Sequence, residues 1–220
     1  MVTDKTQYYV QQQRLSFVQF LAELPNFLAV TVSAVLTGSL LVWLDFLDSL
    51  GNVLRTGAVT AITWRLSVDP HRRSPCDANR IENTAVLFCD GLVMCGLMTC
   101  AALSVYEILV PHRPSELLVY VVVLKVVNVI FDGIFLFKQA GIRKMDQGML
   151  AQSNYTTAFG MLLFDVEGMV SLMLISMFRD SLWVWYFSPI ISLLITAYLA
   201  CKCASRLRGA VGQLCGGTTN

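Results

Sequence analysis

The sequence predicts an all-α integral membrane protein, a bundle of six transmembrane helices with both termini on the cytosolic side. Of its 220 residues, 55% are hydrophobic and only 14% are charged, whereas a soluble domain carries about 25% charged residues. Six apolar segments are each long enough to cross about 30 Å of hydrocarbon as a helix. The Lys and Arg residues between the segments gather on one side, which sets the orientation.

The first two apolar segments predict a helical hairpin. The first covers about residues 16–36 and contains Pro25, where we expect a kink. The short turn "TGS" leads to the second segment, about residues 40–64. Runs of this length without strict alternation of apolar and polar residues predict helices rather than the strands of a membrane barrel.

Four further segments follow, separated by polar stretches. They cover about residues 84–110, 117–137, 156–178 and 182–200. The loop "PHRPSE" follows the third segment, the linker "KQAGIRKMDQGMLAQSN" follows the fourth, and "RDS" follows the fifth. We therefore expect a polar N-terminal tail at 1–13, a six-helix transmembrane domain at 14–208 and a short C-terminal tail at 209–220.

The basic residues outside the spans predict which side faces the cytosol. The inner side carries twelve of them: Lys5, Arg14, Arg65, Arg72, Arg73, Arg80, Lys138, Arg143, Lys144, Lys202, Arg206 and Arg208. The opposite side carries two, Arg113 and Arg179. This positive-inside asymmetry places both termini in the cytosol or its topological equivalent. It identifies a side of the membrane and leaves open which membrane the protein occupies.

Several classes of function have no support in the sequence. No nucleotide-binding loop or metalloprotease motif is present, and no Ser/His/Asp or Cys/His arrangement can be assembled. We expect neither an enzyme nor a resident cofactor. The formal net charge is +1, with no basic patch that would bind nucleic acid. The seven cysteines are scattered and predict no disulfide framework.

Carboxylates inside the second and fifth segments carry the functional information. Asp45, Asp48 and Asn52 are spaced i, i+3 and i+7, so they share one helical face. Asp165 lies at a similar depth in the fifth segment. A charge at the centre of a bilayer costs at least ~2.5 kcal/mol, so such residues mark ion pathways or internal pairs.

Two interpretations of these residues remain open at this point. Carboxylate and amide oxygens suit a divalent cation, so Asp48, Asn52 and Asp165 could surround one ion. Alternatively they pair internally, for example Lys125 with Asp90 or Asp165, and hold the bundle together. We expect Arg55 to snorkel toward the inner end of its helix.

Four motifs resemble the transmembrane domain of the cation diffusion facilitator family, the zinc and manganese proton-coupled antiporters. The stretch "TGSLLVWLDFLDSLGNVL" resembles the second helix, with "DSL" nine residues after the Ser. "NRIENTAVLF" and "YEILVPHRP" resemble the beginning and end of the third helix. "WYFSPIISLLITAYL" resembles the sixth helix, with Ser188 where the family has Asp. The resemblance spans about residues 14–208 and implies a six-helix bundle of this type.

The resemblance also implies a metal site. The family binds its ion with two side chains of the second helix and two of the fifth, which correspond here to Asp48, Asn52, Met161 and Asp165. Asn and Met replace a carboxylate and an imidazole, which weakens a zinc site and removes titrating groups. Asp45, one turn before Asp48, could supply a replacement carboxylate.

Two functions follow from the resemblance as expectations. The first is a divergent divalent cation transporter for zinc or manganese that works by alternating access. The second is a transport-inactive relative that serves as a structural or accessory subunit of a larger membrane complex. The family usually carries a C-terminal cytosolic domain that stabilises its dimer, and we expect this chain to lack it. The expected partners are the lipid bilayer and either a second copy or other membrane subunits.

Overall fold

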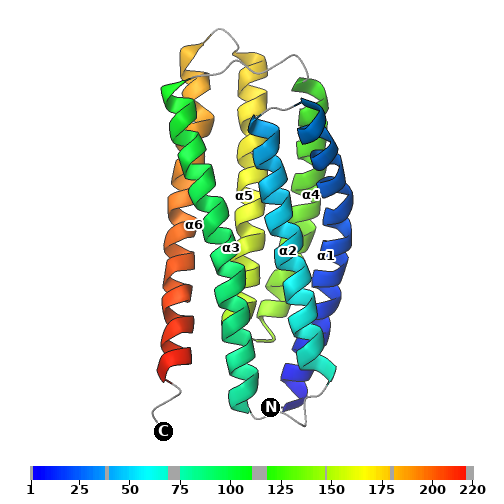
Figure 1. The fold of residues 1–220 in the computed structure, drawn as a ribbon. Coiled ribbons are helices and arrows are strands. Elements are labelled where there is room, and N and C mark those ends of the chain that lie inside the picture. Colours follow the sequence, from blue (N-terminus) through cyan, green and yellow to red (C-terminus); the bar gives the residue numbers. More distant parts are fainter. Residues whose placement is uncertain are drawn as a thin grey trace.

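The computed structural model describes residues 2–37, 40–68, 75–110, 118–146, 148–178 and 181–216, which form six helices (Figure 1). The helices are α1 (Val2–Thr37), α2 (Leu40–Val68), α3 (Pro75–Leu109), α4 (Leu118–Arg143), α5 (Met149–Met177) and α6 (Leu182–Gly216). The six predicted apolar segments each lie within one of these helices, apart from a few residues at their ends. The all-helical fold class is therefore confirmed.

The helices are longer than the hydrocarbon core of a bilayer requires. They contain 26 to 36 residues, and at 1.5 Å per residue they span roughly 39–54 Å. Helix therefore continues into stretches expected to be polar tails and linkers. α1 begins at Val2, α6 ends at Gly216, and the connection between α4 and α5 is reduced to residues 144–148. In that connection the Gly148 amide donates to Asp146 Oδ1 at 3.2 Å.

Successive helices run in opposite directions, so the beginning of α1 and the end of α6 lie at the same end of the bundle (Figure 1). We call this the inner end, since it carries the basic residues of the predicted cytosolic side. α1 packs against α2, α3 against α6, and α4 against α5. α5 also contacts α3 and α6, and α2 contacts α3, so α5 lies centrally.

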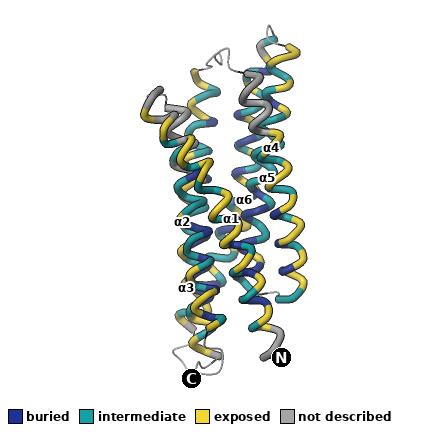
Figure 2. Tube along the Cα trace, turned by 90° about the vertical axis from the view of Figure 1, so that its right-hand side faces the viewer, coloured by how far each residue is buried: buried dark blue, intermediate teal, exposed yellow. Residues whose placement is uncertain are grey.

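Large apolar side chains cover the outer surface of the bundle. Exposed positions recur along the lengths of the helices (Figure 2), and they include Leu28, Val32, Met98, Ile130, Phe137, Leu194 and Tyr198. Buried polar side chains lie inside, among them Gln12, Gln19, Asp90, Gln139 and Asn154. A soluble protein rarely exposes large apolar patches of this kind. The distribution fits a bundle whose solvent is lipid.

Three helices are long and apolar enough to cross a membrane when only the described residues are considered. They are Cys76–Leu109, Met149–Met177 and Trp183–Cys215. They belong to α3, α5 and α6. The membrane character of the chain is therefore confirmed, while the crossing of the other three helices stays a prediction.

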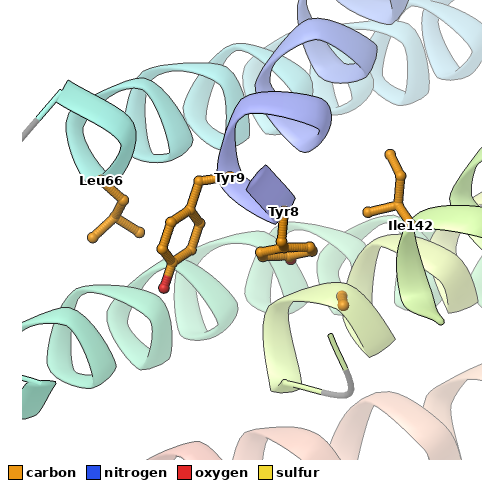
Figure 3. Close-up of a cluster of buried hydrophobic side chains, with 5 residues drawn as sticks. Tyr8, Tyr9, Leu66 and Ile142 are labelled. Carbon is orange, nitrogen blue, oxygen red and sulfur yellow. The ribbon is translucent and has the colours of Figure 1, made fainter. Parts of the chain in front are cut away.

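An apolar cluster ties the first turns of α1 to the inner ends of three other helices. Figure 3 shows Tyr9 beside Leu66 of α2 and Tyr8 facing Ile142 of α4. The Tyr9 hydroxyl donates to a carboxylate oxygen of Glu82 on α3. Burial, together with Glu82, raises the pKa of Tyr9, so the phenol stays protonated and can donate this bond. The cluster anchors the N-terminal turns of α1 to the bundle.

Candidate functional site

The predicted residues of the second segment all lie on α2. Asp45, Asp48 and Asn52 belong to one continuous helix, and α-helical geometry places them on one face. The Asn52 side chain is half-buried. The side chains of Asp45 and Asp48 lie outside the described residues. For these two residues, the structure shows only their positions along α2.

The predicted residues of the fifth segment lie one turn apart on α5. Met161 and Asp165 are both half-buried. Their spacing of i and i+4 puts them on the same face of the central helix. Met161 contacts Arg55 of α2, and Asp165 lies one turn farther along the same face of α5.

Arg55 connects the two helices at the level of these residues. Its Nη2 lies 3.9 Å from the Sδ of Met161. α2 and α5 run antiparallel (Figure 1), so Asn52 and Asp165 both lie toward the same end of the bundle from this contact. At 1.5 Å per residue, Asn52 lies about 4.5 Å and Asp165 about 6 Å farther along the axis. Asn52 and Asp165 thus lie on the same side of the Arg55–Met161 contact.

The snorkelling predicted for Arg55 is wrong. Arg55 is the sixteenth of the 29 residues of α2, and only 4% of its surface is exposed. Its Nη2 instead reaches across the interior to the Sδ of Met161 on α5. Glu23 on α1, Asp90 on α3 and Asp132 on α4 all attract its charge. The position of Arg55 along α2 does not predict in which direction its side chain points.

Within the described residues, the hydrogen bonds of Arg55 are weak for a buried cation. A thioether sulfur is a weak acceptor, and the Met161 contact is long at 3.9 Å. The Nε of Arg55 is buried and has no hydrogen-bond partner among the described residues. A charged donor left this way carries a desolvation cost of at least about 1–3 kcal/mol.

Asp90 has a partner that sequence reasoning did not identify. Arg206 of α6 donates from Nε to Asp90 Oδ2 at 2.7 Å and from Nη2 to Oδ1 at 3.3 Å. Ser153 of α5 adds a third bond to Oδ1 at 2.5 Å. The suggested pairing of Lys125 with Asp90 stays a prediction, because the Lys125 side chain lies outside the described residues. Arg206 lies beyond the predicted end of the sixth apolar segment near residue 200, but α6 continues to Gly216 and carries Arg206 back to the bundle.

A second intramembrane carboxylate on α5 is held by hydroxyl groups. Glu167 Oε1 accepts from Ser171 Oγ at 2.8 Å, and Oε2 accepts from Ser192 Oγ of α6 at 3.2 Å. Both serines are buried. These bonds hold Glu167 at the contact between α5 and α6. The bond from Ser192 joins the two helices.

The described side chains contain no group of three or more His, Cys, Asp or Glu residues that could hold a metal ion. The side chains of Asp45 and Asp48 lie outside the described residues, so this result does not cover them. Within the described part, Asn52, Met161 and Asp165 supply one amide, one thioether and one carboxylate. Of these, only the carboxylate is a strong ligand for a divalent cation, so a site at this level depends on carboxylates of α2.

Comparison of the sequence with models of known protein families identifies the family of the chain. The model of the cation efflux transmembrane domain matches residues 16–215. The chain belongs to the cation efflux family. The resemblance noted in its second, third and sixth helices is thus confirmed, and with it a multi-pass integral membrane protein in a family of cation transporters. No curated protein sequence gives a significant match to the chain.

Proposed function

We propose that this cation efflux protein transports a divalent metal cation, zinc or manganese, by alternating access. Asp48, Asn52 and Asp165 are the proposed ligands, with Asp45 or Met161 assisting. The proposed topology has six membrane spans, with both termini on the cytosolic side. The proposed assembly is a homodimer, or one subunit of a larger membrane complex.

The contact of Arg55 with Met161 is the observation that best supports this site. It joins α2 and α5 across the bundle interior at 3.9 Å. Asn52 is one turn from Arg55, and Asp165 is one turn from Met161, on the same side of the contact. This contact supports the proposal because it links, through two long side chains, the two helices that carry the proposed ligands.

The nature of the donors favours an ion that accepts oxygen ligands. Zinc is normally held by His, Cys and carboxylate groups in a closed tetrahedron. Manganese accepts carboxylate and carbonyl oxygens with a larger coordination number. A set of two or three Asp carboxylates with one Asn amide suits manganese better, so we expect the protein to prefer manganese over zinc.

Flux into proteoliposomes tests the proposal. Purified protein is reconstituted, and uptake of Mn²⁺ and Zn²⁺ is compared with that of empty liposomes. We expect uptake by the wild type and its loss in the double variant Asp48→Ala plus Asp165→Ala, since two of the carboxylates are removed. The variant Lys202→Gln, at an exposed position of α6, is the control and should transport normally.

An accessory role is the second candidate, and the burial of Arg55 favours it. A permanent positive charge at 4% exposure lies where the ion would bind, and like charges repel. A relative that no longer transports would keep the fold for packing against partner subunits. Absence of both flux and metal binding in the wild type, with a double variant that is equally stable or more stable, would support this role and exclude the transporter.

A further inference from the structure

α4 ends and α5 begins toward the inner end of the bundle (Figure 1), and a cavity of about 410 Å³ lies between them. The described residues that line it are Ala140, Arg143, Lys144, Gln152 and Tyr155. Ala140 and Arg143 belong to the last turn of α4, Lys144 follows directly, and the other two belong to the first two turns of α5. Spacings of three and four residues turn the side chains of each helix toward the same space.

The cavity is positively charged. Arg143 and Lys144 are exposed, and no described carboxylate pairs with either of them. Asp146, the acidic residue of the same turn, is not among the lining residues. Its Oδ2 is buried, and its Oδ1 accepts a hydrogen bond from the Gly148 amide at 3.2 Å. Both cations are therefore available to an anion that enters the cavity.

An aromatic ring of α5 orients one of these cations. The guanidinium carbon of Arg143 lies over the Tyr155 ring, 4.6 Å from its centre, which is a cation–π contact between α4 and α5. A guanidinium that stacks on a ring keeps its in-plane N–H donors available, and these donors match two oxygens of a phosphate. Lys144 adds a more mobile ammonium, and Gln152 adds an amide. The cavity thus offers donors suited to a phosphate group.

The cavity lies where the apolar outer surface of α4 ends. Ile130, Ile134 and Phe137 are large, exposed apolar side chains of this helix. Arg143 follows Phe137 by six residues, which is about 9 Å along the helix axis. The interfacial layer on each side of the hydrocarbon core is roughly 5–7 Å thick. The two basic residues are therefore at the level of the lipid head groups, on the side that the positive-inside rule assigns to the cytosol.

We propose that this cavity binds the phosphate of an anionic phospholipid of the cytosolic leaflet, whose acyl chains lie along the exposed apolar side chains of α4. Basic pockets between transmembrane helices on the cytoplasmic side suit such head groups. Two cations match a phosphomonoester, which carries a charge of about −1.5 to −2 near neutral pH. We therefore expect a preference for phosphatidic acid over zwitterionic phosphatidylcholine. The site is separate from the proposed ion ligands and does not depend on transport.

Binding of short-chain lipids to the purified full-length protein in neutral detergent micelles tests the site. The probes are dioctanoyl phosphatidic acid, dioctanoyl phosphatidylcholine and inorganic phosphate. Because each basic residue contributes about fivefold to the affinity for an anionic lipid, Arg143→Gln plus Lys144→Gln should weaken the binding of phosphatidic acid about 25-fold. Lys138→Gln is the matched control, since Lys138 is exposed on the same helix but does not line the cavity. It should bind phosphatidic acid like the wild type.

Substitutions on α5 test the same site from the other helix. Gln152→Glu places a carboxylate beside the two cations and should weaken binding by at least about fivefold. Tyr155→Leu removes the ring beneath Arg143 and should weaken binding about two- to fivefold, whereas Tyr155→Phe keeps the ring and the affinity. Each variant is first checked for monodisperse elution and for an unchanged midpoint of thermal unfolding without lipid. If the double variant does not fold, Gln152→Glu carries the test.

Three results would overturn this inference. If Lys138→Gln weakens binding as much as the double variant, diffuse surface charge attracts the lipid and the cavity is not a site. Equal affinities for phosphatidic acid and phosphatidylcholine would exclude recognition of the anionic phosphate. If inorganic phosphate binds as tightly as phosphatidic acid, the cavity takes a soluble anion and the lipid assignment is wrong. The flux experiment on the ion ligands is unaffected by any of these results.

Discussion

At the scale of single residues, the Asp90–Arg206 pair is the best-defined polar contact in the bundle. Asp90 is fully buried, and the side chain of Arg206 is 10% exposed. Two bonds from Arg206 and one from Ser153 satisfy the carboxylate. The pair joins α3 to α6, and the Ser153 bond extends the contact to α5. It therefore holds α3, α5 and α6 together inside the bundle.

Breaking this pair from one side should be strongly destabilising. We expect Arg206→Gln to reduce the free energy of unfolding by about 3–5 kcal/mol, because Asp90 would remain buried without its counter-charge. The double variant Asp90→Asn plus Arg206→Gln should recover most of the loss, since no buried charge is left. Reversible unfolding in mixed micelles measures both values.

The exposed Lys202 provides the control for this experiment. It lies one turn before Arg206 on α6 and contacts the Tyr198 ring, with its Nζ 5.7 Å from the ring centroid. Lys202→Gln should leave the stability unchanged. Equal stability of Arg206→Gln and wild type would show that the ion pair does not hold the helices together.

At the scale of helices, α5 and α6 approach each other closely at Gly160. A Cβ atom placed there would lie 2.8 Å from Leu199 Cδ1 and 3.3 Å from Cδ2. Leu199 is only 5% exposed, so it has little room to move away. Small residues at such positions allow helices in membranes to pack closely.

We expect Gly160→Ala to destabilise the bundle by up to ~2 kcal/mol, because overpacking costs about 1–3 kcal/mol and the gain in helix propensity offsets up to ~1 kcal/mol. Gly96→Ala on α3 is the matched variant, since nothing lies within 4 Å of its added Cβ. It should be neutral or stabilising. The two midpoints of thermal unfolding, measured in the same detergent, give the comparison, and a stabilising Gly160→Ala would contradict the close packing.

The sequence predicted the number and order of these helices because each contains an apolar run long enough to cross a membrane. The ends were harder to predict. Apolarity marks the part of a helix in lipid, whereas hydrogen bonding and packing continue the helix beyond it. The inner end of α1 illustrates this, since Tyr8 and Tyr9 pack against Leu66 and Ile142 in a stretch expected to be a tail.

The site was only partly predictable for a related reason. The positions of Asn52, Met161 and Asp165 came from motifs, and their spacing gave the faces of α2 and α5. The direction of the Arg55 side chain depends on tertiary packing against α5, where it contacts Met161, and no local pattern reveals this. The partner of Asp90 was missed for the same reason, because Arg206 lies 116 residues away along the chain.

At the scale of the whole molecule, the bundle is inverted relative to a soluble protein, with apolar side chains outside and many polar ones inside. Such a surface is stable only in lipid or detergent. For the proposed transport, we expect an ion to enter and leave at the ends of the bundle, because its sides face lipid. The predicted orientation places the inner end in the cytosol.

The natural cysteines test the proposed orientation. Cys76 begins the apolar run of α3 and Cys215 lies near the end of α6, both exposed at the inner end of the bundle. Because the basic residues gather at that end, the positive-inside rule places it in the cytosol.

In single-cysteine variants, a membrane-impermeant charged maleimide should label both positions in inside-out vesicles and neither in sealed right-side-out vesicles. Cys95, exposed in the middle of α3 where lipid surrounds the helix, should resist labelling from both sides. Labelling of Cys76 and Cys215 from opposite sides would mean an odd number of crossings from α3 to α6, whereas labelling of both from outside would reverse the proposed orientation.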